Sequence, residues 1–387
     1  MTIRIFISTG EVSGDLQGAL LINALKRQAQ NLGRELEIFA LGGSRMAQAG
    51  AKLLGDTTKI GSVGILESLP YILPTLQIQN RAKQYLRENP PDLVILIDYM
   101  GPNLAIGSFI RSHLTNVPVV YYIAPQVWVW SLSDRDTNQI IKNSDLILAI
   151  FPEETSFFAG KGAKVTWVGH PLLDKMTAAP TRSAARASLG IAPEETIITL
   201  VPASRRQELK YVLPVMLAAA KTLQSKLPEV KFLIPLSLEA FREPIEKAIE
   251  YYNLKATLIA DKNIEAIAAA DLAITKSGTV NLEIALLEVP QVVIYRVNPI
   301  TAWIAKNILK FSIPFMSPPN LALMKAIVPE LLQEQATPEN IVQEALNLLN
   351  PAKRSQVLID YQQMRQALGE EGRVCDRAAQ EIFTLLP

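Results

Sequence analysis

Short apolar runs alternate along the chain with longer segments in which apolar residues recur every three or four positions. In the first half the short runs lie at 3–8, 36–41, 93–97, 119–123 and 146–150. Continuous apolar runs of this length are typical of strands buried on both faces. The segments between them have helical spacing, notably 15–30, 69–88 and 103–113. Strands that alternate with helices predict a parallel sheet covered by helices on both sides.

The same pattern restarts in the second half of the chain. Strands are predicted at 197–201, 231–235, 256–259, 272–275 and 291–295. The small and polar segment 181–193 between the two halves predicts a linker. Three helical patterns at 338–349, 354–368 and 373–385 have no strand after them, so we expect at least one to pack back across the junction. The prediction is two α/β domains, at 1–175 and 176–351, with a helix at about 352–387 returning to the first.

Composition excludes several classes of protein. Apolar residues make up 49% of the 387 positions and charged residues 19%, which is typical of a folded chain. The formal charge of +1 lacks the basic excess of a nucleic-acid binder. No apolar run reaches the roughly 18 residues of a membrane-spanning helix. One cysteine and two histidines leave no disulfide framework and no cysteine-based zinc cluster, and no metal or cofactor is expected. Without a signal-peptide pattern at its start, the chain is expected in the cytoplasm.

Candidate chemistry in the first half lies at the carboxyl ends of strands, where open α/β sheets bind their ligands. The stretch 9–14 (Thr-Gly-Glu-Val-Ser-Gly) follows the first strand, and its glycines would let a backbone approach an anion at the start of the next helix. Its spacing is not GxGxxG, and the alternative is a turn with Ser13 or Asp15 capping the helix. Asp98 directly follows five apolar residues and is either a general base or a capping, salt-bridged carboxylate.

The second half offers a second anion site. Arg205 follows a strand, and a guanidinium suits a phosphate through paired hydrogen bonds; the alternative is an exposed arginine at a helix start. Ser277, Gly278 and Thr279 precede a helix at 280–287, where free amides would attract an anion. Glu283, one turn inside that helix, could hold a sugar diol or simply be solvated.

Other conspicuous residues have plainer explanations. His170 sits in a Gly/Pro-rich junction, where a structural hydrogen-bonding role is commoner than acid–base catalysis. Trp128 and Trp130 are expected in the core or in the wall of a cleft. The segment 300–311 places apolar residues beside two lysines. Such a helix could touch a membrane, although packing against its own sheet is the commoner arrangement.

Taken in order, these segments resemble the lipid-A-disaccharide synthases, which are glycosyltransferases of the GT-B fold. The resemblance covers nearly the whole chain. It rests on the segments 10–15, 62–67, 97–98, 121–130, 168–171, 202–205, 277–283, 295–296, 319–321 and 329–333.

The resemblance implies two Rossmann-like domains facing a central cleft, and a metal-independent, inverting reaction. UDP-2,3-diacylglucosamine would donate its sugar to 2,3-diacylglucosamine 1-phosphate (lipid X), and UDP would leave. Asp98 would be the base, Arg205 and the 277–279 amides would hold the diphosphate, and Glu283 would hold the ribose. Further substrate contacts would come from Glu11, Ser13, Gly14 and Asn320. The family resemblance also implies a peripheral protein on the cytoplasmic face of the inner membrane, strengthens the membrane interpretation of 300–311, and allows a homodimer.

The chain departs from the family pattern in places. The family stretch Asp-x-Pro-Asp-Phe-Asn is here Asp-Tyr-Met-Gly-Pro-Asn at 98–103, so the second carboxylate is missing. Ala203 replaces a glycine before Arg205, and Leu323 and Met324 enlarge the loop after Asn320. These changes keep two alternatives open. One is a GT-B enzyme with another acceptor or an epimerase of UDP-sugars, and the other is a nucleotide-sugar-binding protein without catalysis.

Overall fold

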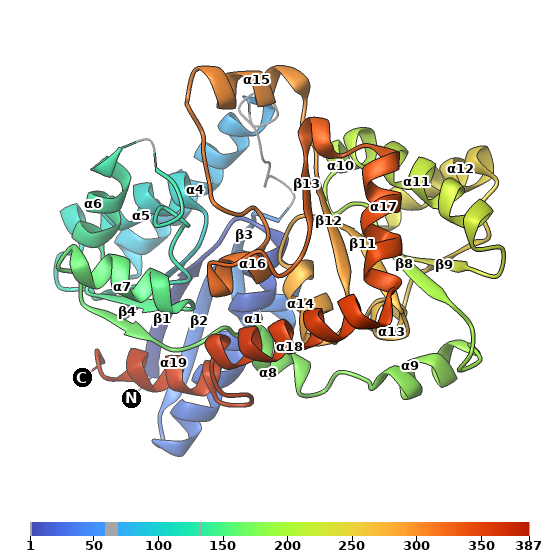
Figure 1. Cartoon of the computed structure of the whole chain (residues 1–387). Helices are drawn as coiled ribbons and strands as arrows, with labels where there is room; N and C mark the ends of the chain where they lie inside the picture. Colours follow the sequence, from blue (N-terminus) through green and yellow to red (C-terminus); the bar gives the residue numbers. More distant parts are fainter. Residues whose placement is uncertain (1, 59–68, 132, 387) are drawn as a thin grey trace. The chain divides into compact units, whose positions relative to one another are not determined.

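The computed structural model describes residues 2–58, 69–131 and 133–386, and it divides into two compact units (Figure 1). Unit 1 comprises Met1–Lys175 and Leu368–Pro387, and unit 2 comprises Met176–Ala367. The sequence assigned everything from about 352 onward to the first domain, whereas here 352–367 belong to unit 2. The segment 62–67, which contributed to the family resemblance, lies outside the described residues.

Unit 1 is built on a parallel sheet of seven strands in the order β3-β2-β1-β4-β5-β6-β7. The strands are β1 (Thr2–Ser8), β2 (Glu35–Gly42), β3 (Lys52–Asp56), β4 (Leu93–Ile97), β5 (Val119–Tyr122), β6 (Leu146–Ala149) and β7 (Val165–Trp167). The five strands predicted from apolar runs are present. The unpredicted β3 and β7 are the two edge strands, and they lack a continuous buried run because one side of an edge strand is uncovered.

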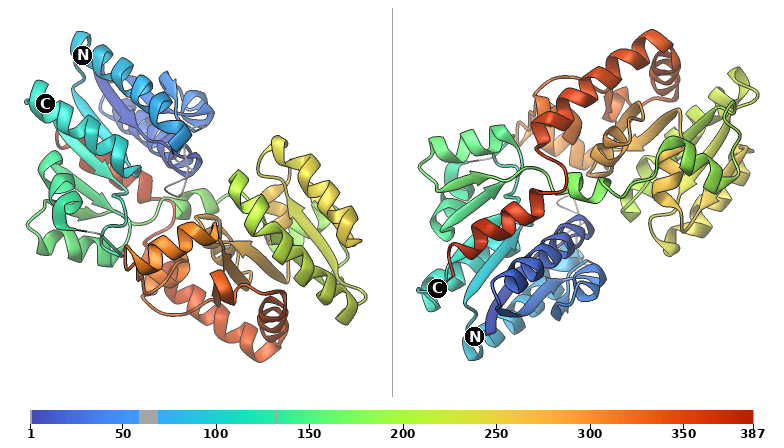
Figure 2. Two further views of the ribbon diagram at one scale, coloured as in Figure 1. Left: turned by 90° about the horizontal axis from the view of Figure 1, so that it is seen from above. Right: turned by 90° about the horizontal axis from the view of Figure 1, so that it is seen from below.

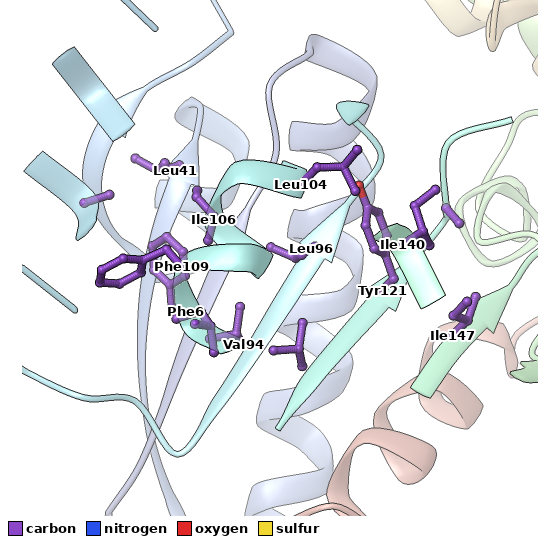
Figure 3. Packing of buried hydrophobic residues seen from close by; sticks show 14 of the residues in the cluster. Phe6, Leu41, Val94, Leu96, Leu104, Ile106, Phe109, Tyr121, Ile140 and Ile147 are labelled. Carbon is purple, nitrogen blue, oxygen red and sulfur yellow. The ribbon is translucent and has the colours of Figure 1, made fainter. Parts of the chain in front are cut away.

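Helices cover both faces of this sheet. They are α1 (Val12–Asn31), α2 (Ser44–Gln48), the 3₁₀ turn η1 (Leu69–Tyr71), α4 (Ile72–Glu88), α5 (Met100–His113), α6 (Asp134–Asn143), α7 (Pro152–Gly160), α8 (Leu172–Met176) and α19 (Val374–Phe383). On one face Phe6, Val94 and Tyr121 pack against Phe109 and Ile140 from the helices (Figure 3). On the other face α19 packs against α1, so the first and last elements of the chain share one unit (Figure 2).

Unit 2 repeats the plan with six parallel strands in the order β10-β9-β8-β11-β12-β13. The strands are β8 (Ile197–Val201), β9 (Lys231–Pro235), β10 (Ala256–Ile259), β11 (Leu272–Lys276), β12 (Gln291–Tyr295) and β13 (Glu330–Leu332). Its helical segments are α9 (Arg182–Leu189), α10 (Arg206–Tyr211), α11 (Leu213–Lys226), η2 (Glu239–Phe241), α12 (Arg242–Tyr252), α13 (Asn263–Ala268), α14 (Val280–Leu286), α15 (Pro299–Asn307), α16 (Pro318–Leu323), η3 (Gln333–Gln335), α17 (Pro338–Leu349) and α18 (Pro351–Leu368).

The predicted linker at 181–193 was wrong, because α9 occupies most of it. Thr181 caps this helix by accepting a hydrogen bond from the Ala184 amide, and Gly190 ends it in the left-handed region. Ala185 and Arg186 of α9 are buried against the rest of unit 2. The small residues therefore serve a tightly packed helix inside unit 2, which begins at Met176.

Strand order reverses at one place in each sheet. In unit 1 the chain runs outward from β1 in one direction and from β4 in the other, and in unit 2 the equivalent neighbours are β8 and β11. At such a reversal the loops leaving two adjacent strands diverge, so a crevice forms at the carboxyl ends. Asp98, Arg205 and Ser277 lie in the segments that follow three of these strands, and Ser13 lies at the start of α1, which follows β1.

Candidate functional site

The turn between β1 and α1 is shaped by two close approaches at glycines. A Cβ at Gly14 would lie 1.8 Å from the Thr9 Oγ1 atom, and a Cβ at Gly10 would lie 2.0 Å from the Tyr99 ring. Both glycines are therefore required for packing. Ser13, which lies between these two glycines in the first turn of α1, is half-buried.

The predicted caps of this helix were wrong. The helix begins at Val12, three residues earlier than expected, and its N-cap is Glu11, whose side chain makes no capping hydrogen bond. The Asp15 carboxylate instead accepts hydrogen bonds from the amides of Gly43, Arg45 and Met46. Asp15 thus caps α2 across the sheet edge, a contact between segments 28 to 31 residues apart that local spacing does not reveal.

Asp98 lies immediately after β4 on a strained backbone. Its φ is +47°, that of Tyr99 is +52°, and that of Ile123 at the end of neighbouring β5 is +58°. A non-glycine residue in this region costs on the order of 1–3 kcal/mol and persists only where its surroundings hold it. The Asp98 amide donates to the Ile123 carbonyl at 2.9 Å, and the Tyr121 hydroxyl donates to the Asp98 carbonyl at 3.0 Å.

Asn103 completes the restraint, although the sequence reading assigned it no role. Its fully buried amide donates to the carbonyls of Asp98 at 2.7 Å and Ile97 at 3.0 Å, and its Oδ1 accepts from the Ser8 hydroxyl at 2.7 Å. One side chain thereby joins the ends of β1 and β4. The only signal for it in the sequence was its place at the end of the stretch 98–103.

The missing second carboxylate of that stretch corresponds to Gly101. An added Cβ at Gly101 would meet no atom within 4 Å. Packing therefore does not explain the glycine.

Two buried titratable groups lie in the same unit. Burial, with a smaller contribution from the Asp98 charge, raises the pKa of Glu154 to about 8, although its Oε2 accepts hydrogen bonds from Ile150 and Phe151 amides. Burial lowers the pKa of His170 to about 3. The His170 Nδ1 accepts from the Leu172 amide. His170 is therefore neutral and structural near pH 7, in agreement with the prediction.

Arg205 occupies the N-cap position of α10 at the carboxyl end of β8. The buried Glu208 carboxylate accepts from the amides of Ser204 at 2.6 Å and Arg205 at 2.9 Å, which shapes the turn. Its other oxygen lies 3.7 Å from the guanidinium, beyond hydrogen-bonding distance, and 31% of the Arg205 side chain is exposed. The turn therefore presents a guanidinium at the reversal point while Glu208 satisfies its amides.

The prediction of free amides at 277–279 was wrong for two of the three residues. The Ser277 amide donates to the Ile294 carbonyl, and the Gly278 amide donates to Asn281 Oδ1 at 2.7 Å. Buried amides require such partners, and the neighbouring strand and the buried Asn281 supply them. The Ser277 and Gly278 amides are therefore not offered to a ligand, and the turn has its side chains and Thr279 for that purpose. Glu283 lies four residues after Thr279 on the same face of α14.

Asn320 is fully engaged inside unit 2. Its Oδ1 accepts from the amides of Ile327 and Val328, and its Nδ2 donates to Glu330 at 2.7 Å. Glu330 also accepts from the Met316 and Ser317 amides. The Met316 carbonyl in turn accepts from the Ser277 hydroxyl at 3.1 Å. Asn320 therefore holds a loop against the Ser277 turn rather than presenting its amide outward. Asn281 and Glu330 lie in the family segments 277–283 and 329–333, but the resemblance implied no role for either.

Unit 1 also has a hollow at the amino ends of its strands, at the end of the sheet opposite to Asp98. Its volume is about 620 Å³, and its lining includes Arg4, Glu37, Lys52 and Asp92. Glu37 pairs with Arg4 and Lys52, and Asp92 accepts from the Arg4 amide. Because this hollow lies at the amino ends of the strands and its charges are paired with one another, we do not assign it to the site. Among the described residues, no group of three or more His, Cys, Asp and Glu side chains could hold a metal ion.

Solved structures with the same architecture identify the class of this fold. The S. aureus MnaA–UDP co-structure matches with a TM-score of 0.67 and 15% identity, over 98% of this chain and 96% of that one. The Acinetobacter baumannii MurG structure matches with a TM-score of 0.56 and 19% identity, over 99% of both chains. The two parallel-sheet units, each with polar residues at its reversal point, therefore define a protein of the GT-B class.

The family model described as lipid-A-disaccharide synthetase matches residues 5–383, and the chain belongs to that family. A lipid-A-disaccharide synthase from Gloeothece citriformis is 61% identical over 98% of this chain and 99% of its own length. The synthase from Synechocystis sp. is 57% identical over 98% of this chain and 97% of its own length. These similarities extend across both units.

Proposed function

We propose that this chain is the glycosyltransferase that condenses UDP-2,3-diacylglucosamine with 2,3-diacylglucosamine 1-phosphate in lipid A biosynthesis. The observation that carries the proposal is family membership over the full length, at 61% identity to a lipid-A-disaccharide synthase. The arrangement of the family motifs at the two strand-order reversals supports it. The acceptor is assigned to unit 1 and the donor nucleotide to unit 2.

Asp98 is assigned the role of general base. Its Oδ atom takes the proton of the acceptor 6-hydroxyl while that oxygen forms a bond to C1 of the donor sugar. The C1–O bond to the diphosphate breaks, its electron pair leaves with UDP, and attack from the opposite face inverts C1. The side chains of Asn103 and Tyr121 donate to the Asp98 carbonyl and so fix the backbone from which the carboxylate extends. This supports the role, because proton transfer requires correct positioning.

The donor side uses residues that the strand ends of unit 2 present. The Arg205 guanidinium is assigned to the diphosphate, Glu283 to the ribose diol, and the Thr279 hydroxyl to a phosphate oxygen. Ser277, whose hydroxyl donates to the Met316 carbonyl, is assigned to shaping this turn. Asn320 is assigned a positioning role, since its amide and carbonyl groups are used within its own loop. On unit 1, Glu11, Ser13 and Gly14 are assigned to the edge at which the acceptor binds.

The decisive experiment is mass spectrometry of the product formed by the purified protein from the two lipid substrates. We expect a tetraacyl disaccharide 1-phosphate and one UDP per disaccharide. If the protein converts the UDP-sugar into an isomer when no acceptor is present, it is an epimerase and the proposal is wrong. UDP release with a different acceptor would retain the enzyme class and change the substrate. If the protein binds UDP but forms no product and releases no UDP from the donor, it is a binding protein without catalysis.

We also propose that α15 contacts the membrane that contains these lipids. In α15 no residue is buried, and Ile300, Trp303 and the following Ile308 are each about 60% exposed. Lys306 and Lys310 are exposed beside them. The commoner expectation, a helix packed against its own sheet, is therefore not met. No helix of the described ranges is long and apolar enough to cross a membrane. An exposed apolar surface flanked by lysines suits an anionic lipid surface.

Vesicle co-sedimentation tests this contact. Trp303→Ser together with Ile308→Ser should lower binding to vesicles of phosphatidylglycerol and phosphatidylethanolamine about tenfold or more. Each substitution removes apolar area that the membrane would bury, worth up to about 1.5–3 kcal/mol for a side chain that becomes fully buried. Tyr251→Ser with Leu238→Ser, which changes exposed apolar residues of unit 2 outside α15, is the matched control. Equal binding by all three proteins would remove α15 from the membrane contact.

A further inference from the structure

Lys276 is the last residue of β11 and carries a cationic side chain, and the sequence motifs predicted no role for it. Only 7% of the residue is exposed. Its carbonyl accepts from Asn281 Nδ2 at 3.1 Å, which fixes its backbone at the strand end. A Cβ built on Gly278 would lie 2.3 Å from the Lys276 Nζ atom. The ammonium group therefore lies directly against the Cα of Gly278, within the Ser277–Thr279 turn.

The glycine and the lysine are matched to each other. Gly278 has a φ of +154°, which L-residues rarely adopt, so both its conformation and the nearby ammonium exclude a side chain. Glycine thus leaves the ammonium room beside the turn. An ammonium in a place sheltered from water interacts more strongly with an anion than an exposed one does, because the effective dielectric constant there is lower.

The position of Lys276 points to the nucleotide. β11 pairs with β8, and Arg205 follows β8, so two cationic residues lie at the ends of the two strands where the order reverses. The Ser277 and Gly278 amides, which would otherwise hold an anion, are used by Ile294 and Asn281. With these two amides in use, we look to the side chains at this turn for charge that can bind a diphosphate.

We propose that Lys276 binds the diphosphate of the nucleotide-sugar donor through its ammonium group, with Gly278 kept bare to admit it. The inference rests on the proposed function for its donor, a nucleoside diphosphate sugar. It adds one further residue that binds the donor and distinguishes the contribution of the lysine from that of the arginine. Lysine supplies a sheltered point charge, and Arg205 supplies a planar pair of donors from the partly exposed side.

Calorimetric titration of the full-length protein with UDP and with uridine tests the proposal. Lys276→Met should raise the Kd for UDP about tenfold to hundredfold and leave that for uridine unchanged, because only UDP carries the charge that the ammonium binds. Lys226→Met is the matched control. Lys226 is exposed at the end of α11, which leads into the amino end of β9, whereas Lys276 lies at the carboxyl end of β11. This variant should bind UDP like the wild type.

Two further variants keep the test open if Lys276→Met is unstable. Lys276→Arg should retain more UDP affinity than Lys276→Gln at equal thermal stability, because it keeps the charge. Loss of UDP and uridine binding in parallel would mean that Lys276 only supports the fold, and unchanged UDP binding in folded Lys276→Met or Lys276→Gln would mean that it touches no diphosphate. Either result overturns the inference.

Steady-state kinetics separate the two phosphate-bearing substrates. A raised KM for the UDP-sugar with an unchanged KM for the acceptor 1-phosphate supports the assignment, and the reverse would place Lys276 at the acceptor and overturn it. The proposed function fails separately. If the wild-type protein binds no UDP, both proposals fail. If the wild type binds UDP and the Lys276 variants bind it with the same Kd, only this proposal fails.

Discussion

Asp98 shows how a single residue is made ready for chemistry by its backbone rather than by its own side chain. Its φ of +47° is unfavourable, and hydrogen bonds to its amide and carbonyl hold it in place. Ser8, Asn103 and Tyr121 come from three different elements, so the restraint is tertiary. Residues held in sparsely populated conformations cluster at functional sites, which agrees with the base role proposed for Asp98.

Replacing Asp98 with asparagine should lower the transfer rate about 10²- to 10⁴-fold, because the amide cannot accept the proton of the acceptor hydroxyl. The wild-type rate should fall as the pH drops and the carboxylate becomes protonated, and the variant should lose this acidic limb. Both are read from the pH dependence of UDP release. Asp261→Asn, an exposed carboxylate of unit 2, is the control. An unchanged rate and pH profile in Asp98→Asn would exclude Asp98 as the base.

At the scale of elements, α9 shows how a short polar-looking segment becomes part of the fold. The Arg186 guanidinium on this helix is buried and donates to the carbonyls of Ala269, Ala192 and Glu195 and to the Asp271 carboxylate. Arg182, one turn earlier, pairs with the same carboxylate but has a side chain that is 44% exposed. The two arginines therefore share a partner and differ in burial.

Removing the buried arginine should destabilise unit 2 far more than removing the exposed one. We expect Arg186→Leu to lower the free energy of unfolding by about 3–5 kcal/mol, because it leaves buried carbonyls and part of a carboxylate without donors. Arg182→Leu should cost at most about 1 kcal/mol, as exposed pairs do. Both losses of stability are measured by urea unfolding of unit 2, monitored through hydrogen exchange of the β8 and β11 amides. Equal losses would show that Arg186 contributes no more than a surface ion pair.

The predictability of most strands followed burial. The edge strand β10 is an exception, because it is half-exposed and was predicted at its observed bounds. Strands buried on both faces, such as β4 and β8, are continuous apolar runs and were predicted within a residue of their observed ends. The edge strands β3 and β13 are short and half-exposed, so no apolar run marks them. For α1 the prediction began three residues late, because the helix starts without a side-chain cap.

At the scale of the whole molecule, two buried groups of unit 1 oppose each other in their effect on stability. The pKa of Glu154 rises from 4.5 to about 8 on folding, so its protonated form is favoured in the folded state and stability is lost as the pH rises through this window. The pKa of His170 falls from 6.5 to about 3, so stability is lost as the pH falls through its window. Between pH 4.5 and 6.5 the two slopes oppose; between 6.5 and 8 only that of Glu154 remains.

Unit 1 should therefore lose stability between pH 6.5 and 8, by up to about 1.4 kcal/mol per pH unit from Glu154. Glu154→Gln should remove this loss, because glutamine does not ionise and can still accept from the Ile150 and Phe151 amides. Hydrogen exchange of β5 and β6 at a series of pH values measures the difference between the two proteins. The exposed Glu88→Gln on α4 is the control. Parallel pH dependences of Glu154→Gln and wild type would show that Glu154 is ionised throughout.

The amino-acid sequence by itself determined the two parallel α/β units, the family and the strand ends at which the candidate residues lie. These depend on apolar periodicity and on motif order, which are local properties. The tertiary structure decided which groups at those ends are already used. Asn103 secures Asp98, Asn281 and Ile294 occupy the Gly278 and Ser277 amides, and Lys276 lies against Gly278. Some of these partners are near in sequence, but the bonds of Ser277 to Ile294, of Asn103 to Ser8 and of Asp15 to Gly43 join distant segments. Sequence spacing does not show which polar groups pair, because burial requires each of them to find whatever partner the packing brings to it.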